Sequence, residues 1–507
     1  MTERVVRSPL DGSYSAAEVF RVLHGDDTDV FWLDGGQTSL VGRGEPWYPG
    51  TASDQKGGVL ESLRTALAAP ADRAAGADRA AGADRAAGAD RAAGADVGAP
   101  AGVRAQAMLG LVGWLGYEVL GETVGADALS FSAHRSSPHP DAAFLRVDRA
   151  VAVAAGGSAE LLAAGDAWEG DLEQWRRVTV ERLAAVATRP DSDPDSTAAA
   201  APIPTAASAC TPAPSRVTAP HRLAQWRETD AEYLANIAAC QDSIHAGDAY
   251  VLNLTTTVTV AAAPRTTAGA QPALDPVAVY RALRRTSPSE HGALLRIGGV
   301  SLLSASPELF LDISADGHVR TSPVKGTRAR ADHPEADAAR AAALAADVKE
   351  RAENTMIVDL MRNDLTRISV PGSVHVTSLL TVETHAHVHQ LVSTVEGQLP
   401  PGSGVVDVLR STFPAGSMTG TPKRRAVEIL DRLEGRARGL YSGAFGFLGA
   451  DGSAELAMTI RSIVIDDRGA TIGVGGGITA LSNPVDELAE VKLKAAALLE
   501  ALDVAAT

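Results

Sequence analysis

The chain has 507 residues, of which 46 are Lys or Arg and 62 are Asp or Glu, so its formal net charge at pH 7 is -16. An acidic chain lacks the positive surface that attracts phosphates, and we expect no nucleic-acid partner. The N-terminal stretch has no signal-peptide core, and no uncharged apolar run of about 18 residues occurs, so we expect no membrane partner. Two cysteines, Cys210 and Cys240, fit a reducing compartment and a cytoplasmic protein.

Composition divides the chain into three parts. Residues 1–187 form an N-terminal domain with a low-complexity insertion at 71–96, where the hexamer ADRAAG is repeated four times. A six-residue period matches neither helix nor strand, which indicates a flexible or partly helical surface insertion. Residues 188–221 are rich in Pro and Ala and form a linker. The remaining segment, 222–507, is the C-terminal domain and holds all candidate site residues.

Strand patterns dominate the first half of the C-terminal domain. The stretches 249–260, 293–297 and 301–313 are rich in β-branched and apolar residues. Gly298 and Gly299 separate the last two, which predicts a hairpin. The segments VFWLDGG and MLGLVGWLGYEVL of the N-terminal domain show similar strand and turn patterns. We therefore expect an antiparallel sheet core.

Two predicted helices carry acidic pairs. Residues 335–364 contain no Pro or Gly and predict one helix, with Glu350 and Glu353 on the same face. A second helix begins after Asn483, with Pro484 at its first position, and carries three charged residues on one face, namely Glu487, Glu490 and Lys494. Two such faces could together bind Mg²⁺, which prefers a few carboxylate oxygens. The alternative is two ordinary solvated faces with salt bridges.

Two glycine-rich segments are candidate anion sites. The stretch GSMTGTPKRRAVEIL from Gly416 does not match a Walker phosphate loop, because Thr421 and Pro422 separate Gly420 from its lysine. We interpret it as a helix start with Thr421 as N-cap and Pro422 at the first position. The stretch GVGGGI, 473–478, could expose backbone amides to an oxyanion, or it could be a simple turn.

A histidine run raises the alternative of a zinc hydrolase. His385, His387 and His389 alternate in HAHVH and would share one side of a strand. No carboxylate or cysteine stands at a supporting spacing, so the sequence favours this reading least.

Nine motifs in order resemble the chorismate-utilising enzymes. They are SPELFL, SPVKGTRAR, RAENTMIVDLMRNDL, HQLVSTVEGQL, FPAGSMTGTPKRRA, YSGAFGFLG, MTIRSIVI, GVGGGIT and DELAEVKLKA, and they span about residues 230 to 502. The resemblance implies an α+β fold like that of anthranilate synthase component I. In it, large antiparallel β-sheets pack against each other and helices flank them.

Site residues carried over by position follow from this resemblance. It implies Mg²⁺ as cofactor, with Glu353 and Glu490 as ligands and Glu350 and Glu487 as supporting or water-mediated partners. It further implies that chorismate, a dianion, is held by a set of positive and hydrogen-bonding groups, namely Thr327, Tyr441, Arg461, Lys494 and the amides of Gly475, Gly476 and Gly477. Arg, Lys, Mg²⁺ and free amides all supply the positive charge that such a ligand needs.

Two residues would carry the chemistry. Glu308 in SPELFL resembles the general acid that protonates the departing 4-hydroxyl of chorismate. Lys325 in SPVKGT stands where aminodeoxychorismate synthases commonly have lysine and anthranilate synthases have alanine. A neutral lysine amine there can attack C2, and ammonia can then attack C4, which gives 4-amino-4-deoxychorismate. The resemblance therefore implies an aminodeoxychorismate synthase component I, an aminotransferase-type enzyme.

Alternatives within and outside this family stay open at this point. Water-using members have a general-base lysine where this chain has Val251, which disfavours isochorismate chemistry. The chain has Gln390 preceded by His389 where the family often has His, so the role of His389 is open. Anthranilate synthase component I is the second reading, and a non-catalytic chorismate-binding subunit is the third.

The source of ammonia is a separate question. No G-x-C-x-G nucleophile motif occurs, and Cys210 and Cys240 lie in the linker and in a helical stretch. The resemblance implies a glutamine amidotransferase partner that supplies ammonia. The product would lead to 4-aminobenzoate after a separate lyase, for folate or for a secondary metabolite.

Overall fold

The computed structural model describes residues 4–50, 58–75, 109–124, 136–185, 222–262, 274–385 and 388–504, and the structural statements that follow concern these residues. Its strands are β1 (Val5–Leu10), β2 (Val30–Gly35), β3 (Thr38–Arg43), β4 (Glu45–Trp47), β5 (Gly110–Leu115), β6 (Ala142–Val147), β7 (Arg149–Ala154), β8 (Ala159–Ala164), β9 (Ala224–Trp226), β10 (Val251–Ala261), β11 (His291–Ile297), β12 (Val300–Ser306), β13 (Leu309–Ile313), β14 (His318–Ser322), β15 (Val324–Ala329), β16 (His375–Thr384), β17 (Val388–Gln398), β18 (Gly420–Thr421), β19 (Ala444–Gly449), β20 (Ala454–Met458), β21 (Ser462–Asp466) and β22 (Gly469–Ile478).

The helices are α1 (Ala16–His24), α2 (Gly58–Ala75), α3 (Gly170–Ala184), α4 (Asp230–His245), α5 (Pro276–Thr286), α6 (Pro334–Ala346), α7 (Val348–Thr366), α8 (Val405–Thr412), α9 (Lys423–Glu434) and α10 (Pro484–Ala501), with short 3-10 helices η1 (Tyr117–Glu122) and η4 (Gly416–Met418). Among the described helices, none combines the length and the apolar character that a membrane span requires.

These strands form two antiparallel sheets. The first sheet has 12 strands in the order β1-β8-β7-β3-β2-β11-β12-β21-β22-β10-β18, with β9 beside β10. The second sheet has 10 strands in the order β15-β17-β14-β13-β20-β19-β5-β6-β4, with β16 beside β17. The predicted hairpin is confirmed, since β11 and β12 pair directly and both Gly298 and Gly299 have positive φ. The predicted antiparallel core is confirmed as well.

Alternation along the strands explains why the sheets pack face to face. In β2, the side chains of Phe31 and Leu33 join a core that also contains Trp114 and Phe445 of the second sheet. Trp32, on the opposite face of β2, joins the core beneath the helices. Successive side chains of a strand point to opposite faces, so a strand with apolar residues at every position is buried on both sides. The sequence VFWL therefore occupies the centre of a layered structure.

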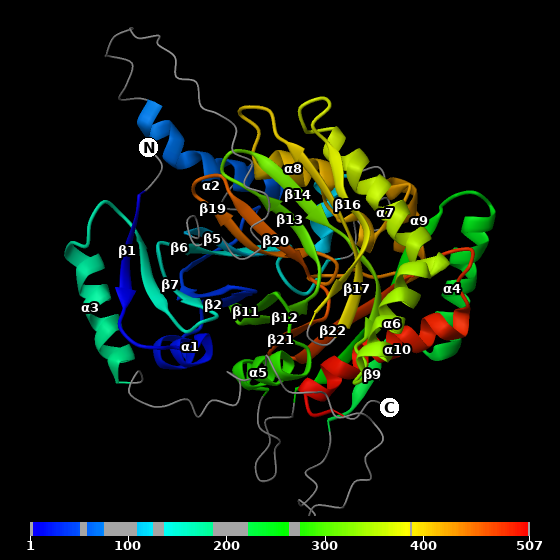
Figure 1. Cartoon of the computed structure of the whole chain (residues 1–507), viewed down its shortest axis with the longest axis horizontal. Helices are drawn as coiled ribbons and strands as arrows, with labels where there is room; N and C mark the ends of the chain where they lie inside the picture. The colour runs from blue at the N-terminus through cyan, green and yellow to red at the C-terminus, as the bar shows by residue number, and fades with distance from the viewer. Residues whose placement is uncertain are drawn as a thin grey trace, which may run out of the picture.

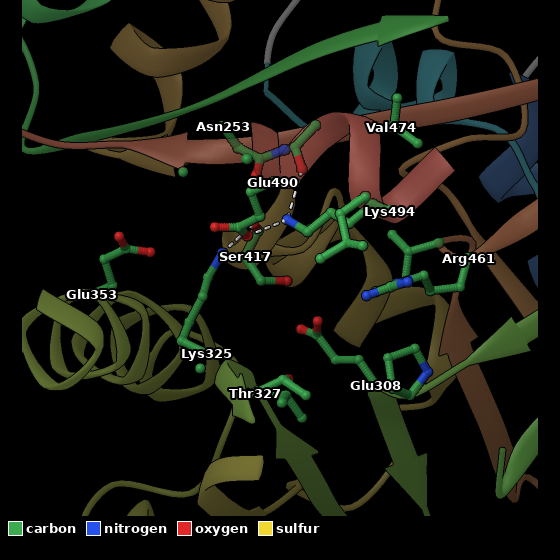
Figure 2. Close-up of a pocket in the computed structure, with 18 of the residues that line it drawn as sticks. Asn253, Glu308, Lys325, Thr327, Glu353, Ser417, Arg461, Val474, Glu490 and Lys494 are labelled. Atoms are coloured by element: carbon green, nitrogen blue, oxygen red, sulfur yellow. Dashed lines mark hydrogen bonds and ion pairs between the residues drawn. The ribbon is translucent and has the colours of Figure 1, made fainter. Parts of the chain in front are cut away.

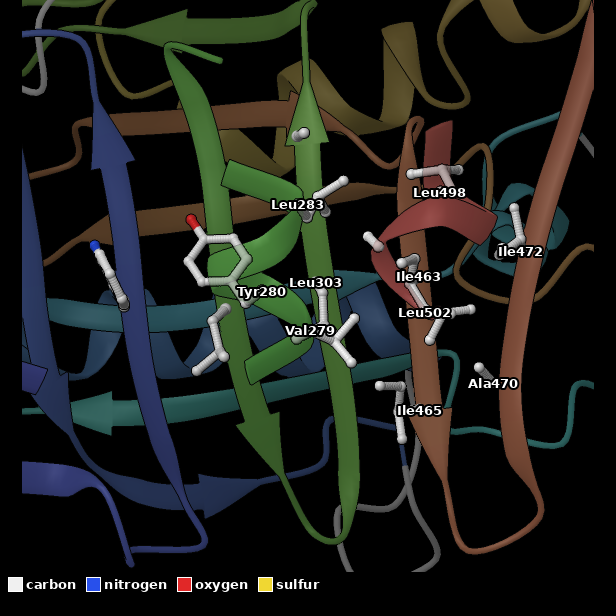
Figure 3. Close-up of a cluster of buried hydrophobic side chains, with 14 of the residues drawn as sticks. Val279, Tyr280, Leu283, Leu303, Ile463, Ile465, Ala470, Ile472, Leu498 and Leu502 are labelled. Carbon is white, nitrogen blue, oxygen red and sulfur yellow. The ribbon is translucent and has the colours of Figure 1, made fainter. Parts of the chain in front are cut away.

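Helices cover the two outer faces. Figure 1 shows α2, α7 and α8 along one side of the pair of sheets, and α5 and α10 along the opposite side. Figure 3 shows the contact between α5, α10 and the first sheet, where Tyr280, Leu283 and Leu498 pack on Leu303 and Ile463. The order of layers is helices, first sheet, second sheet, helices, which agrees with the expected α+β class.

The two parts of the sequence on either side of residues 188–221 share both sheets. In the first sheet β2 pairs with β11, and in the second β5 pairs with β19. The described strands therefore do not separate into two independent cores along the proposed boundary. The linker itself lies outside the described residues, as does the ADRAAG repeat beyond Ala75.

Two predicted helix boundaries are wrong. The stretch 335–364 is not one helix: it breaks at Asp347, whose side chain accepts a hydrogen bond from Glu350 N and so begins α7 as an N-cap. The helix after the GSMTGT segment begins at Lys423 with Pro422 as its N-cap, because Thr421 is held in β18 opposite Val251. The helix after Asn483 begins as predicted, with the Asn483 side chain accepting from Val485 N.

A buried ion pair lies between β10, η4 and η1, next to the interior cavity described below. Glu434, at the end of α9, accepts two hydrogen bonds from the Arg438 guanidinium, at 2.9 and 2.7 Å. The same guanidinium donates to the carbonyl oxygens of Met418 and Asn253 and lies 4.4 Å from the centre of the Tyr117 ring. Both charged residues are less than a tenth exposed. Arg438 thus joins segments that are distant in sequence.

We expect Arg438→Met to lower the free energy of unfolding by about 3–5 kcal/mol, because it leaves the Glu434 carboxylate buried without its partner. Urea denaturation measures the change. Arg362→Met is the control, since Arg362 pairs with Asp359 on an exposed face of α7 and such pairs contribute about 1 kcal/mol or less. Equal losses in the two variants would contradict the structural role of Arg438.

Candidate active site

Two charged side chains lie where the chain passes between the sheets. Glu308 lies between β12 of the first sheet and β13 of the second, and Arg461 lies between β20 of the second and β21 of the first. The crossings are hydrogen-bonded to each other: Met458 N donates to Glu308 O at 3.0 Å, and Ala305 N donates to Arg461 O at 3.1 Å. Arg461 has φ of +50°, a strained conformation for a residue other than glycine. The change of sheet therefore sets the position of both side chains.

A cavity of about 580 Å³ opens at these crossings. Every site residue expected from the sequence lines it, namely Glu308, Lys325, Thr327, Glu350, Glu353, Tyr441, Arg461, Gly475, Gly476, Gly477, Glu487, Glu490 and Lys494. Figure 2 shows Lys325, Glu308 and Arg461 entering it from different elements. Tertiary structure thus brings together residues that are up to 186 positions apart, counted from Glu308 to Lys494 (494 minus 308).

Lys325 extends into the cavity from β15, an edge strand of the second sheet. Its Nζ donates a hydrogen bond to the carbonyl oxygen of Ser417 at 3.2 Å, across the cavity in η4 (Figure 2). Thr327, two residues further along β15, lines the same cavity. Gly326 between them has φ of +94°, and a Cβ there would lie 2.9 Å from Leu344 of α6. Glycine at this position lets β15 lie close to the helix layer with Lys325 directed inward.

Glu308 is suited to hold a proton. Its side chain is buried, and burial raises the pKa of its carboxyl above the ordinary value. The Ser417 hydroxyl and the Lys325 ammonium oppose this shift without reversing it. A protonated carboxyl beside an amine provides an acid and a nucleophile in one cavity.

Four carboxylates face the cavity from two helices. Glu350 and Glu353 lie on α7, and Glu487 and Glu490 lie on α10. Burial raises the pKa of Glu353 to about 7, against the opposing effect of Lys325. Burial also raises the pKa of Glu350. For Glu490, nearby lysines outweigh burial and lower the pKa.

The donor set fits a hard cation such as Mg²⁺, although the side chains do not close around one as they lie. No three His, Cys, Asp or Glu side chains of the described residues are arranged as metal ligands. The Lys349 ammonium lies instead between the helices, 2.5 Å from Glu487 Oε1 and 3.8 Å from Glu353 Oε1. The Glu353 and Glu487 carboxylates already share the Lys349 ammonium. Carboxylate oxygens are also the donors that Mg²⁺ prefers. The interpretation as solvated helix faces is wrong for Glu353 and Glu487, which are both buried.

The glycine-rich stretch 473–478 is part of β22 and not a turn. Gly475, Gly476 and Gly477 lie opposite Thr255, Leu254 and Asn253 of β10, while the pairing of β22 with β21 ends at Ile472. One edge of this segment is therefore unpaired by strands. Lys494 Nζ donates to Gly475 O at 2.9 Å from that edge, which indicates that Gly475 directs its polar groups there. By strand alternation the Gly477 amide shares this edge and the Gly476 amide faces β10.

The absence of side chains in β22 lets two other groups approach. A Cβ on Gly473 would lie 2.1 Å from Tyr441, and one on Gly477 would lie 3.1 Å from a carboxylate oxygen of Glu353. Tyr441 is buried, and burial raises the pKa of its hydroxyl to about 12, so this group remains a hydrogen-bond donor. Glycine is required here for close packing around the cavity.

The two histidines of the run that the structure describes, His385 and His389, do not line the cavity. His389 Nδ1 lies 2.9 Å from the Thr384 hydroxyl, and His389 Nε2 lies 2.9 Å from Asp337 Oδ1, so its ring is held by neighbouring elements. His385 lies near Glu290, and His387 lies outside the described residues. The next residue in β17, Gln390, lines the cavity instead. The role left open for His389 is therefore a contact with α6, not with the cavity.

Sequence reasoning missed several cavity-lining residues, among them the polar residues Asn253, Lys349, Gln390 and Ser417. Asn253 and Ser417 are buried, and in the described structure the Asn253 Nδ2 atom has no hydrogen-bond partner. The signal for Asn253 was a polar residue within a long apolar strand. For Lys349 it was the position four residues before Glu353. Val251, on β10, is buried in the apolar core of the second sheet.

Without a bound metal, the stability of the protein should fall as pH rises toward 8. The folded-state pKa of Glu353 is about 7, above the ordinary value of 4.5, so the stability it contributes is present below pH 4.5 and is lost as pH rises through 7. We expect Glu353→Gln to flatten this dependence, by on the order of 3 kcal/mol between about pH 5 and 8.

Urea unfolding in EDTA measures this effect. Glu490→Gln is the control, since the pKa of Glu490 is lowered and its titration lies below this window. Parallel pH curves for the unsubstituted protein and Glu353→Gln would contradict the prediction.

Curated relatives with similar sequences include proteins named aminodeoxychorismate synthase and anthranilate synthase component 1. The chain is 43% identical over 399 residues to "Aminodeoxychorismate synthase" of Streptomyces griseus, which covers 78% of this chain and 50% of that protein. It is 42% identical over 276 residues to "Anthranilate synthase component 1" of Streptomyces coelicolor, covering 54% of this chain and 52% of that protein. The chain thus spans about half the length of these relatives.

Solved structures of the same fold agree with the expected architecture. Anthranilate synthase component I from Streptococcus pneumoniae superposes with a TM-score of 0.63 at 22% identity, covering 98% of this chain and 92% of that one. MenF from Escherichia coli, titled a menaquinone-specific isochorismate synthase, superposes with a TM-score of 0.65 at 17% identity, covering 98% and 94%. The expected fold like that of anthranilate synthase component I is confirmed.

The model of one protein family spans almost the whole chain. The chorismate binding enzyme family matches residues 52–500, which includes most strands of both sheets and every residue that lines the cavity. The motifs quoted from the sequence lie on the elements that build the cavity, from β12 to α10. On the combined evidence of sequence, fold and cavity, this chain is a member of the chorismate binding enzyme family.

Proposed function

We propose that this chain converts chorismate and ammonia into 4-amino-4-deoxychorismate through a covalent adduct on Lys325. The observation that carries the proposal is the Lys325 amine directed into the cavity that Glu308 also lines. Similar relatives named aminodeoxychorismate synthase support the same activity. They are about twice as long as the matched segment, so the assignment rests on the cavity of this chain.

In the first step the Lys325 amine attacks C2 of chorismate. The ring double bond shifts as the C4–O bond breaks, and Glu308 donates a proton so that the oxygen leaves as water. Hydroxide is a poor leaving group, so an acid must lie within hydrogen-bonding reach. Burial of Glu308, which keeps its carboxyl protonated, supports this role.

In the second step ammonia attacks C4 of the adduct. The double bond shifts back, the C2–N bond to Lys325 breaks, and the amine is released. The ammonium formed at C4 loses a proton to the Glu308 carboxylate, which restores the acid. The sum is chorismate plus ammonia giving 4-amino-4-deoxychorismate plus water, so each atom is accounted for.

Positive and hydrogen-bonding groups would orient the dianion. Arg461 and Lys494 would bind the carboxylates together with the amides of Gly475 and Gly477, and Thr327 and Tyr441 would contact the substrate from either side. Glu353 and Glu490 would hold Mg²⁺ with support from Glu350 and Glu487, and the ion, when bound, would supply charge to neutralise a substrate carboxylate.

Lys325 and Val251 distinguish this proposal from the neighbouring activities. Val251 is an apolar, buried side chain that cannot activate water, which argues against an isochorismate product. Lys325 supplies a nucleophile that the anthranilate reaction does not need. Anthranilate synthase remains the second candidate, because relatives with that name match at similar identity over a shorter segment.

Ammonia would come from a glutamine amidotransferase partner, and free ammonium at high pH should replace it. A separate lyase would then form 4-aminobenzoate, for folate or for another product. A cytoplasmic location belongs to the same proposal, as expected from the cysteine content.

We expect Lys325→Ala to lower formation of 4-amino-4-deoxychorismate about a hundredfold or more and to leave the dissociation constant of chorismate nearly unchanged. Lys325→Arg keeps the charge but not the nucleophile and should be equally inactive. Product is identified by mass and fluorescence after incubation with chorismate, Mg²⁺ and ammonium. Anthranilate as the product, or full activity of Lys325→Arg, would overturn the proposal.

We expect Glu308→Gln to lower kcat by about 10²- to 10⁴-fold, the usual contribution of a general acid, because the amide cannot protonate the leaving oxygen. Glu455→Gln, on β20 of the second sheet and away from the cavity lining, is the control. Intact mass spectrometry of the chain with chorismate but without ammonia should show the Lys325 adduct in the unsubstituted protein and not in Glu308→Gln. Normal adduct formation in Glu308→Gln would contradict its role as acid.

A further inference from the structure

Lys349 is a cation placed inside the acidic part of the cavity. Its Nζ lies 2.5 Å from Glu487 Oε1 and 3.8 Å from Glu353 Oε1. The two carboxylates are 3% and 7% exposed, whereas the Lys349 side chain is 32% exposed. The ammonium therefore reaches in from the cavity mouth to two deeply buried carboxylates. These belong to different helices, α7 and α10.

Without this ammonium, the buried Glu487 carboxylate would lose its ion-pair partner close to the Glu353 carboxyl. A buried carboxylate that lacks a partner destabilises a protein by several kcal/mol, and two close together also repel. Other lysines at the cavity have different partners: Lys494 pairs with Glu490 and Gly475 O, and Lys325 bonds to Ser417 O. Lys349 is thus the ammonium in contact with the Glu353 and Glu487 pair.

The same carboxylates are those proposed to hold or support Mg²⁺. An ammonium and a divalent cation cannot occupy the same space between Glu353 and Glu487. Lys349 has room to withdraw, because its neighbour Val348 is 74% exposed and Leu493, which lines the cavity from α10, is 72% exposed. A long lysine side chain can therefore leave the carboxylates and remain solvated.

We propose that Lys349 is a built-in counter-ion, which holds α7 and α10 together in the metal-free protein and is displaced when the divalent cation enters. This inference rests on the proposed metal site and adds to it a competing group from the chain itself. It makes the cavity stable before the cation arrives. It also weakens cation binding, since Lys349 must first be released.

Removal of the amine should have opposite effects on stability and on cation binding. We expect Lys349→Met to bind Mn²⁺ about tenfold more tightly than the unsubstituted protein, measured by the electron paramagnetic resonance signal of free Mn²⁺, and to melt at a lower temperature in EDTA. Lys492→Met is the matched control. Lys492 lies on α10, is 40% exposed, and pairs with Asp230 at 2.6 Å away from the cavity, so its replacement should not change Mn²⁺ binding.

Displacement itself can be observed through the reactivity of the amine. We expect the rate of acetylation of Lys349, followed by peptide mass spectrometry, to rise several-fold when Mg²⁺ is added, while that of Lys492 stays constant. A lysine that acts only through its charge from a distance would show no such rise.

The outcomes separate this inference from the proposed function. If the unsubstituted protein binds Mn²⁺ and Lys349→Met binds it equally or more weakly, the counter-ion role is overturned and the metal site stays intact. If Lys349→Met binds Mn²⁺ and the unsubstituted protein does not, the counter-ion role is supported. Mn²⁺ binding is measured with and without chorismate, and no nitrogen source is added. If neither the unsubstituted protein nor Lys349→Met binds Mn²⁺ under these conditions, both the metal site and the counter-ion are overturned.

Discussion

The transfer of the chain between two face-to-face sheets is the constraint on which the site depends. The inner faces of the two sheets are largely apolar, and the chain crosses from one sheet to the other where β12 and β20 end. The segments that contain Glu308 and Arg461 are such places, and they are bonded to each other through Met458 and Ala305. The cavity lies where these crossings interrupt the packing, which explains why an acid and a cation both line it between two largely apolar sheet faces.

Charges inside this cavity are stable because each has a counter-charge or a polar partner nearby. Arg438 and Glu434 compensate each other beneath β10, and their hydrogen bonds hold the carbonyls of Asn253 and Met418, two residues of the cavity lining. Lys349 compensates the acidic helices in a similar way. Buried pairs of this kind contribute little net stability compared with apolar packing, but loss of one partner is costly. In this protein the buried ion pairs fix the positions of charged groups beside the cavity, where an ionic ligand can bind.

The chemistry proposed for this cavity follows from which groups are absent as much as from which are present. Val251 on β10 is an apolar residue packed in a buried core, and Gln390 lines the cavity with an amide while the neighbouring His389 contacts α6. With water activation disfavoured, the proposed nucleophile is the amine of Lys325, which is directed into the cavity. The same architecture could therefore support different nitrogen or oxygen transfers through changes at a few positions on β10, β15 and β17.

The sequence by itself determined the antiparallel sheets, the hairpin at Gly298 and Gly299, and a set of residues that line one cavity, because these follow from local alternation and from motifs such as SPVKGT. It placed Glu350 and Glu353 on one helix face, since that spacing is local, but it missed the break at Asp347, where a side-chain cap outweighs helix propensity. Only the tertiary structure decided that residues 1–187 and 222–507 share both sheets, and that GVGGGI is a strand with one open edge. It also decided that Lys349 lies between two helices. These features depend on contacts between segments far apart in the chain, which no local pattern encodes.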